Sequence, residues 1–189
     1  MKKSSFLLIL FIFAFGERIL FDFGPNVELV TMALILSSFY FGKKESFWLT
    51  FAIIFLSDLV IGNSNIFLFT WTGFLIPALL SRQLINKLTN LQSLKILSLT
   101  SIGLASNLFF YFWTNFGVWI ISGMYPKTGA GLLISYINAL PFLRYQLTST
   151  LIFVPLGFVL TELIISLNKK YQLENKLNYL LSSKSKVIS

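Results

Sequence analysis

The lysine and arginine residues of this chain fall mainly in every second gap between its long apolar runs. The basic gaps contain Lys2 and Lys3, Lys43 and Lys44, Arg82, Lys87 and Lys95, and Lys169 and Lys170, whereas the other gaps contain Arg18, Lys127 and Arg144. Basic residues stay on the cytoplasmic side of a membrane protein as it inserts. If the chain crosses six times with both ends inside, twelve of its 15 basic residues lie on that side. The pattern predicts an all-α, polytopic protein with six transmembrane helices in one bundle and both termini in the cytoplasm.

The composition fits a bundle embedded in the bacterial inner (plasma) membrane. Of the 189 residues, 56% are hydrophobic and 12% are charged, against roughly 25% charged residues in ordinary soluble domains. A soluble fold of this size could not bury so many apolar side chains, but lipid accommodates them. We expect one transmembrane domain over residues 1–168 and a basic cytoplasmic tail over residues 169–189. Because the lysines flank apolar spans, the net charge of +8 does not indicate a nucleic-acid partner.

The residue types absent from the sequence limit the chemistry that it can perform. The chain contains no cysteine and no histidine, which removes thiolate and imidazole metal ligands and the usual Cys or His catalysts. Gly42-Lys43-Lys44 lacks the upstream glycine and the following Ser or Thr of a phosphate-binding loop. We therefore expect no enzyme activity, no cofactor, no metal and no use of ATP by this chain itself.

The apolar runs define six expected spans, at residues 4–23, 27–42, 46–61, 66–81, 96–122 and 145–167. The second to fourth are shorter than the roughly 20 residues that a straight crossing needs. A polar, basic loop is expected at 82–95. A longer outer connection at 123–144 is expected to contain a short interfacial or re-entrant helix at 129–140, stopped by Pro141, which could act as a lid. A cleaved signal peptide is the alternative reading of the N-terminus, with Lys2 and Lys3 before an apolar core.

Most polar residues of the expected spans map to the outer half of the bundle. Asp58 is the most prominent of them, since it lies one helical turn before Gly62, about 6 Å below the outer end of its span. Charged groups at this depth are costly and usually face the bundle interior. Asp58 would either bind a cation or hydrogen-bond donor of a ligand, or pair with Arg18 or Arg144 to hold helices together.

The fifth span carries a polar stripe. Asn107, Tyr111 and Asn115 recur every four residues and so share one helix face. The aromatic residues nearby are Trp113, Trp119 and Tyr125. These side chains offer amides for hydrogen bonding and rings for stacking. The alternative is a polar seam between helices together with an interfacial aromatic belt.

The remaining candidate residues lie at the outer ends of other spans. Arg144 could clamp a carboxylate or phosphate, or contact a lipid headgroup. Arg18 and Asp22 are four residues apart and could pair with each other. The complete set of predicted substrate-binding residues is Asp58, Asn107, Tyr111, Asn115, Trp113, Trp119, Tyr125, Arg144 and Asn26.

Several short motifs occur in an order that resembles a known family. They are Gly24-Pro25-Asn26, Ser57-Asp58-Leu59-Val60-Ile61-Gly62, Thr114-Asn115-Phe116-Gly117-Val118-Trp119, Met124-Tyr125-Pro126-Lys127-Thr128 and Ala139-Leu140-Pro141-Phe142. Across residues 25–158 the chain resembles an uncharacterised bacterial family of proposed transport proteins, whose members are similar to the S components of energy-coupling factor (ECF) vitamin transporters.

The resemblance implies a membrane subunit that captures a small, vitamin-like molecule at the outer face. It also implies partners, namely a transmembrane coupling protein and ATPase subunits. The chain departs from S components in its first span, where Ala14 and Gly16 replace the expected Ala-x-x-x-Ala docking surface. Two alternatives stay open. One is a structural envelope scaffold of similar fold. The other is a lipid-modifying enzyme that uses Asp58 and Glu17 as acid and base, which the missing metal and nucleophile disfavour.

Overall fold

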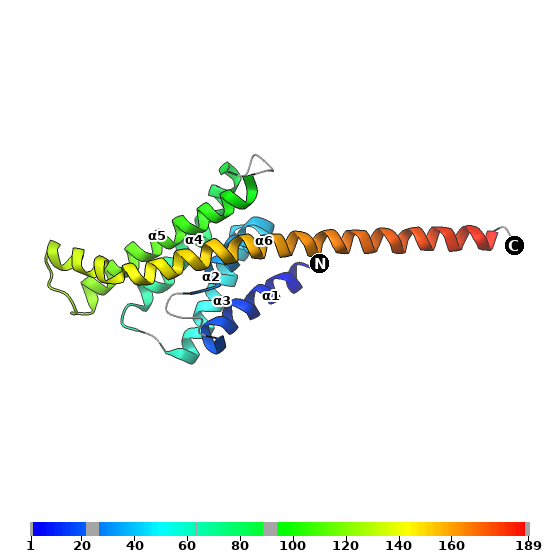
Figure 1. The fold of residues 1–189 in the computed structure, drawn as a ribbon. Coiled ribbons are helices and arrows are strands. Elements are labelled where there is room, and N and C mark those ends of the chain that lie inside the picture. The colour runs from blue at the N-terminus through cyan, green and yellow to red at the C-terminus, as the bar shows by residue number, and fades with distance from the viewer. Residues whose placement is uncertain (1, 22–26, 63, 89–93, 188–189) are drawn as a thin grey trace.

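The computed structural model describes residues 2–21, 27–62, 64–88 and 94–187, with side chains up to residue 173 except that of residue 21. All regular secondary structure in this part of the chain is helical. Its elements in order are α1 (Lys3–Gly16), a π-helical turn η1 (Glu17–Phe21), α2 (Val30–Phe41), α3 (Lys43–Ile61), α4 (Phe67–Leu88), α5 (Lys95–Ile121) and α6 (Gly129–Val187). Figure 1 shows α1 to α5 gathered against the first half of α6, which continues well beyond them.

Three of the described helices are long and apolar enough to cross a membrane. They are α4, α5 and the part of α6 up to residue 173. The all-helical architecture predicted from the sequence is therefore confirmed, and α5 lies within a residue of the expected fifth span. Helix α2 is apolar but only 12 residues long, or about 18 Å, which is shorter than the roughly 30 Å of a hydrocarbon core.

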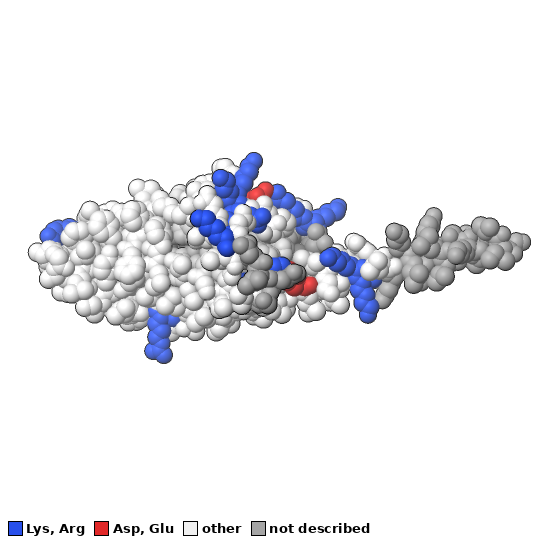
Figure 2. Space-filling view, turned by 90° about the horizontal axis from the view of Figure 1, so that it is seen from above, with Lys and Arg blue, Asp and Glu red and all other residues white. Residues whose placement is uncertain are grey.

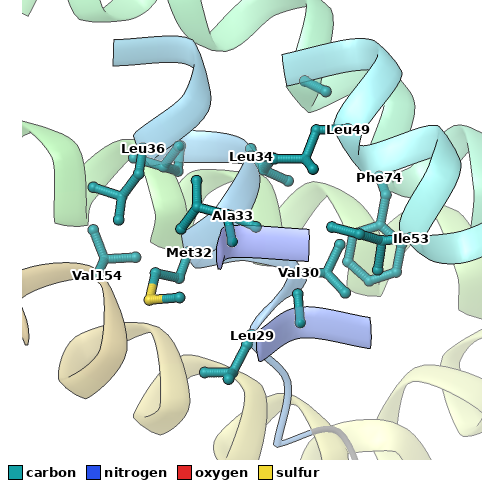
Figure 3. Packing of buried hydrophobic residues seen from close by; sticks show 14 of the residues in the cluster. Leu29, Val30, Met32, Ala33, Leu34, Leu36, Leu49, Ile53, Phe74 and Val154 are labelled. Carbon is teal, nitrogen blue, oxygen red and sulfur yellow. The ribbon is translucent and has the colours of Figure 1, made fainter. Parts of the chain in front are cut away.

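Helix α2 forms the centre of the molecule. Every residue from 30 to 38 is buried, and α2 contacts each of the helices α1, α3, α4, α5 and α6. A helix that is apolar on all sides is expected in such an enclosed position. Figure 3 shows how residues of α2 meet Leu49 and Ile53 of α3, Phe74 of α4 and Val154 of α6.

One end of the bundle carries most of the basic side chains. Lys3 of α1 pairs with Glu45 of α3, and the Tyr40 hydroxyl of α2 donates to Glu162 of α6, so these four positions share one end. Figure 2 shows Lys and Arg gathered toward the end from which α6 projects. The helix directions thus place the lysine-rich gaps together, as the sequence pattern requires.

The outer connection before α6 differs from the prediction. Pro141 does not stop the helix, because α6 runs without a break from Gly129 to Val187. Hydrogen bonds to α5 hold α6 on both sides of this proline: Tyr111 Oη donates to the Tyr136 carbonyl at 2.6 Å, and Asn107 Nδ2 donates to the Gln146 carbonyl at 3.0 Å. A proline removes one helical hydrogen bond, which this packing offsets. The expected short helix at 129–140 is therefore the beginning of α6.

The expected basic loop at 82–95 is also largely helical, since α4 continues to Leu88. Arg82 explains part of this extension, because its Nη1 donates to the Ser38 and Phe39 carbonyls at the end of α2, at 3.1 and 2.6 Å. Ile85 is 1% exposed and belongs to the core. The polar residues Gln83, Asn86 and Lys87 of this helix end are exposed, opposite the buried Ile85.

The close approach of α5 and α6 depends on Gly103. A Cβ atom placed at this residue would lie 2.8 Å from Cγ2 of Thr150, and Gly103 is fully within the helix. Small residues at such a crossing let two helices approach closely. We predict that Gly103→Val lowers the free energy of unfolding by about 1–3 kcal/mol, the usual cost of overpacking.

Thermal unfolding in detergent micelles measures this effect. Gly129→Ala is the matched control, because a Cβ atom there meets nothing within 4 Å. Equal stability of the Gly103→Val variant and the wild type would contradict the close α5–α6 contact.

Candidate functional site

A cavity of about 500 Å³ opens at the end of the bundle opposite the basic end. It lies among the first residues of η1, the last residue of α3, the second half of α5, the segment before α2, the beginning of α4 and the part of α6 from Ala139 to Gln146. The lining residues are Glu17, Arg18, Val27, Glu28, Ile61, Ile66, Thr70, Phe74, Phe110, Tyr111, Thr114, Asn115, Val118, Ala139, Phe142, Leu143 and Gln146. Its volume falls within the roughly 300–1,000 Å³ of typical small-molecule sites.

The π-helical turn η1 supplies two charged residues of the wall. Glu17 and Arg18 are its first residues, and both line the cavity. Glu17 is 4% exposed, and its Oε2 accepts the Leu29 backbone N–H at 3.3 Å. Turns of this kind are rare and frequently occur at functional sites. Within this turn the Glu17 side chain is buried and the Arg18 side chain is 17% exposed.

Asp58 lies directly behind this wall. Its Oδ1 accepts Arg18 Nη2 at 2.8 Å and its Oδ2 accepts Trp71 Nε1 at 2.7 Å. Arg18 Nε also donates to Ser57 Oγ at 2.7 Å. Both oxygens of the carboxylate are therefore engaged by side chains from η1 and α4. This arrangement matches the second reading of Asp58, in which it pairs with Arg18 and holds helices together.

A buried polar network connects the cavity to the bundle centre. Glu28 precedes α2, and its Oε2 accepts the Thr31 N–H at 3.0 Å. Thr31 Oγ1 lies within hydrogen-bonding distance of Glu28 Oε1 and 2.9 Å from Asn107 Oδ1. Asn107 Nδ2 donates to the Gln146 carbonyl at 3.0 Å and to Thr150 Oγ1 at 2.6 Å. The network joins α2, α5 and α6, and two of its members, Glu28 and Gln146, line the cavity.

Of the predicted binding residues, Tyr111 and Asn115 line the cavity directly. Asn115 Nδ2 donates to the Tyr111 carbonyl at 2.8 Å. Asp58 and Asn107 do not line the cavity themselves. Asp58 accepts a hydrogen bond from the wall residue Arg18, and Asn107 donates one to the carbonyl of the wall residue Gln146. The polar stripe of the fifth span is thus divided between the wall and the network behind it.

The other predicted residues lie elsewhere. Trp113 belongs to a separate aromatic groove on the outside of α5, and its Nε1 donates to Thr72 Oγ1 at 2.7 Å. Trp119 Nε1 donates to the Pro126 carbonyl at 2.9 Å, and the Tyr125 hydroxyl accepts Asn138 Nδ2 at 3.3 Å. Arg144 is exposed on α6. Asn26 lies outside the described residues, as does Asp22, the expected partner of Arg18.

Sequence reasoning did not select Glu17, Glu28 and Gln146 as wall residues. The signal for Glu28 was present, since an acidic residue directly precedes the apolar run that becomes the buried helix α2. Glu17 was considered only as an acid or base of the alternative lipid-modifying enzyme, and Gln146 was not selected as a binding residue. Their positions follow from the π-helical turn and from the continuity of α6 through Pro141, which spacing alone did not reveal.

The described residues define an all-helical protein with helices apolar enough to cross a membrane and a cavity of mixed polar and apolar lining at one end of the bundle. Within this part of the chain, no group of three or more His, Cys, Asp and Glu residues could hold a metal ion. The chain belongs to DUF6580, a family of unknown function, which it matches over residues 1–174. None of the curated proteins and none of the solved structures match it.

The brace formed by Arg18 and Asp58 leads to a stability prediction. The two side chains are 17% and 9% exposed, and removal of one partner of a buried ion pair leaves the other charge uncompensated. We predict that Asp58→Ala lowers the free energy of unfolding by on the order of 3 kcal/mol. Chemical denaturation of the purified protein in mixed micelles measures the change.

Glu45→Gln is the control for this variant, because Lys3, its partner, is 54% exposed at the side chain. An exposed ion pair contributes less than about 1 kcal/mol. Equal effects of the two substitutions would mean that Asp58 does not brace the helices beside the cavity.

Proposed function

We propose that this protein is an integral membrane subunit that binds a small molecule from the outer face of the inner membrane and takes part in its uptake. The observation that carries the proposal is the cavity of about 500 Å³. Its wall combines charged and amide groups with apolar and aromatic side chains, which is the usual composition of a ligand site. Vitamins and their precursors are the first candidates, from the resemblance to ECF S components.

The proposal includes six crossings of the membrane. Helix α3 has 19 residues, or about 28 Å, and α1 continued by η1 reaches a similar number of residues. Both are close to the roughly 30 Å of a hydrocarbon core. Helix α2 would reach the outer surface through the segment that precedes it. In this arrangement the cavity faces outward, and the basic end faces the cytoplasm.

The topology makes a direct prediction. Reporter fusions at Lys43, Lys95 and Ser189 should report the cytoplasm, and a fusion at Lys127 should report the outside. Each position is fused in turn to alkaline phosphatase, which is active outside the cytoplasm, and to green fluorescent protein, which fluoresces inside it. An outside location for Ser189 would refute the six-span topology.

A cavity-filling variant tests whether the cavity binds a ligand. Ala139 lines the cavity and is 7% exposed, so Ala139→Leu fills space that the ligand would occupy. We predict that it weakens binding by about tenfold or more, the typical effect of added methylene groups in a fitted pocket. The measurement is a thermal-shift screen with vitamins, vitamin precursors and simple cations, followed by calorimetric titration of each compound that stabilises the protein.

Ala105→Leu is the matched control, because Ala105 is exposed on α5 and does not line the cavity. The same substitution at this position should leave the affinity unchanged. Equal affinities of the two variants would place the ligand elsewhere, and failure of every compound to bind would refute the binding function.

The structural scaffold is the second candidate, and one observation favours it. Helix α6 continues to Val187, far beyond the other helices (Figure 1). A projecting helix offers a surface to another protein, either an envelope partner or the coupling protein of a transporter. Deletion of residues 170–189 separates the two functions. Ligand affinity should survive the deletion if the cavity is the functional site, whereas a scaffold would lose its partner.

A further inference from the structure

We propose that Glu28 binds a proton on the cavity wall and releases it when an organic cation binds in the cavity. This inference rests on the proposed function, to which it adds the class of ligand and the coupled ion. It is based on the number of protons available in the network around Thr31, on the charges of the wall and on its aromatic lining.

The Thr31 hydroxyl has one proton and two apparent acceptors. Its Oγ1 lies within hydrogen-bonding distance of Glu28 Oε1 and 2.9 Å from Asn107 Oδ1. A hydroxyl donates one hydrogen bond and can accept others, whereas an ionised carboxylate only accepts. With an ionised Glu28, one of these two contacts would therefore bring two acceptors together without a proton.

The orientation of the Asn107 amide does not remove this conflict. Its Nδ2 lies 3.0 Å from the Gln146 carbonyl, which can only accept. Rotating the amide by half a turn would place two oxygens against each other at that contact. The Asn107 oxygen therefore faces Thr31 and needs the Thr31 proton.

A protonated Glu28 satisfies every contact in this network. Its carboxyl O–H donates to Thr31 Oγ1, the Thr31 hydroxyl donates to Asn107 Oδ1, and the amide of Asn107 donates to α6. Glu28 is 7% exposed, and burial of an ionised carboxylate is far more costly than burial of its neutral form. Loss of the proton would break the hydrogen bond between Thr31 and Asn107, and so one link between α2 and α5.

The surroundings of Glu28 allow the proton to leave. The titratable groups near it are Glu17 and Arg18 on η1, Asp58 on α3 beyond Arg18, and Tyr111 on α5. Arg18 and the N-terminus of α2 both favour a negative charge at Glu28. The Tyr111 hydroxyl is committed to the Tyr136 carbonyl. The described lining residues of α4 and α6 are uncharged.

The charges of the wall favour a cationic ligand. Glu28 and Arg18 both line the cavity, and Arg18 is already paired with Asp58 at 2.8 Å, so a carboxylate at Glu28 would retain its attraction for a cation. The rings of Phe74, Phe110, Tyr111 and Phe142 also line the cavity, and aromatic faces attract organic cations.

The exchange balances in charge and protons. The cation enters beside the neutral carboxyl group of Glu28, the O–H bond breaks, the proton passes to solvent, and the carboxylate that remains pairs with the cation. No oxidation or reduction takes place.

Infrared spectroscopy of the ligand-free protein in lipid vesicles tests the proton directly. The carbonyl stretch of a protonated carboxyl group should be present at neutral pH in the wild type. Glu28→Gln should remove it without loss of the fold, because the glutamine amide donates to Thr31 as the carboxyl group does. Glu162→Gln, a substitution at the opposite end, should retain it. Absence of the band from the wild type would overturn the proposal.

Thr31→Val provides a second variant that does not depend on the stability of Glu28→Gln. It removes the acceptor of the Glu28 proton and should therefore shift the same band to higher frequency. A protonated-carboxyl band that neither Glu28→Gln nor Thr31→Val changes belongs to another residue and would also overturn the proposal.

Calorimetric titration with benzyltrimethylammonium, a permanent cation, tests the exchange. Titrations in buffers of different ionisation enthalpy measure how many protons leave per bound cation. The wild type and Glu162→Gln should release a proton for each cation, and affinity should rise with pH by up to about tenfold per unit. Glu28→Gln should release none.

The outcomes separate this inference from the proposed function. Cation binding without proton release would overturn the exchange. Binding restricted to neutral or anionic compounds of the screen would overturn the ligand class, while the cavity would remain a binding site. Failure of every compound, whatever its charge, would overturn both proposals.

Discussion

The enclosure of α2 by the other helices is the constraint on which the rest of this structure depends. Its residues 30–38 are all buried, so every polar group on it must find a partner within the protein. Ser37 Oγ donates to the Ala33 carbonyl, and Ser38 Oγ accepts Ser81 Oγ of α4 at 2.8 Å. The carbonyl of Leu34 accepts Ser46 Oγ of α3 at 2.8 Å. Hydroxyl groups on the neighbouring helices thus fix how closely they pack around α2.

Two polar braces join the helices on either side of the cavity. One joins η1, α3 and α4 through Arg18, Asp58 and Trp71. The other joins α2, α5 and α6 through Thr31 and Asn107. The cavity lies between these braces, and Arg18 and Glu28 are the residues through which they reach its wall. The same hydrogen bonds therefore join the helices and support the wall of the cavity.

The sequence predicted the helical architecture because long apolar runs of this length, separated by short polar gaps, are typical of apolar helices. It predicted the α5 boundaries well, since a long apolar run without proline gives no reason to end the helix before the run itself ends. It was wrong at Pro141, because a proline ends a helix only when tertiary contacts do not hold the turns around it. Here Tyr111 and Asn107 supply those contacts from another helix.

The candidate site could be predicted only in part, because contacts between helices decide which side chains reach the cavity. The spacing of Asn107, Tyr111 and Asn115 identified the correct face of α5, but spacing cannot tell which of three residues on a face reaches a cavity. Asn107 is 1% exposed and faces α2 and α6, whereas Tyr111 and Asn115 reach the wall. Asn107 is covered by Thr31 of α2, a contact that the spacing along α5 does not reveal.

The continuity of α6 gives the cavity a physical connection to the opposite end of the molecule. Ala139 and Gln146 of this helix line the cavity, Glu162 accepts a hydrogen bond at the basic end, and the same helix continues to Val187. Packed helices move as stiff units, so a change in tilt at the cavity would displace the projecting end. Pro155 is the position inside the bundle where such a movement could be absorbed. Its neighbour Val154 is fully buried in the core around α2, which resists bending there and favours transmission along the helix.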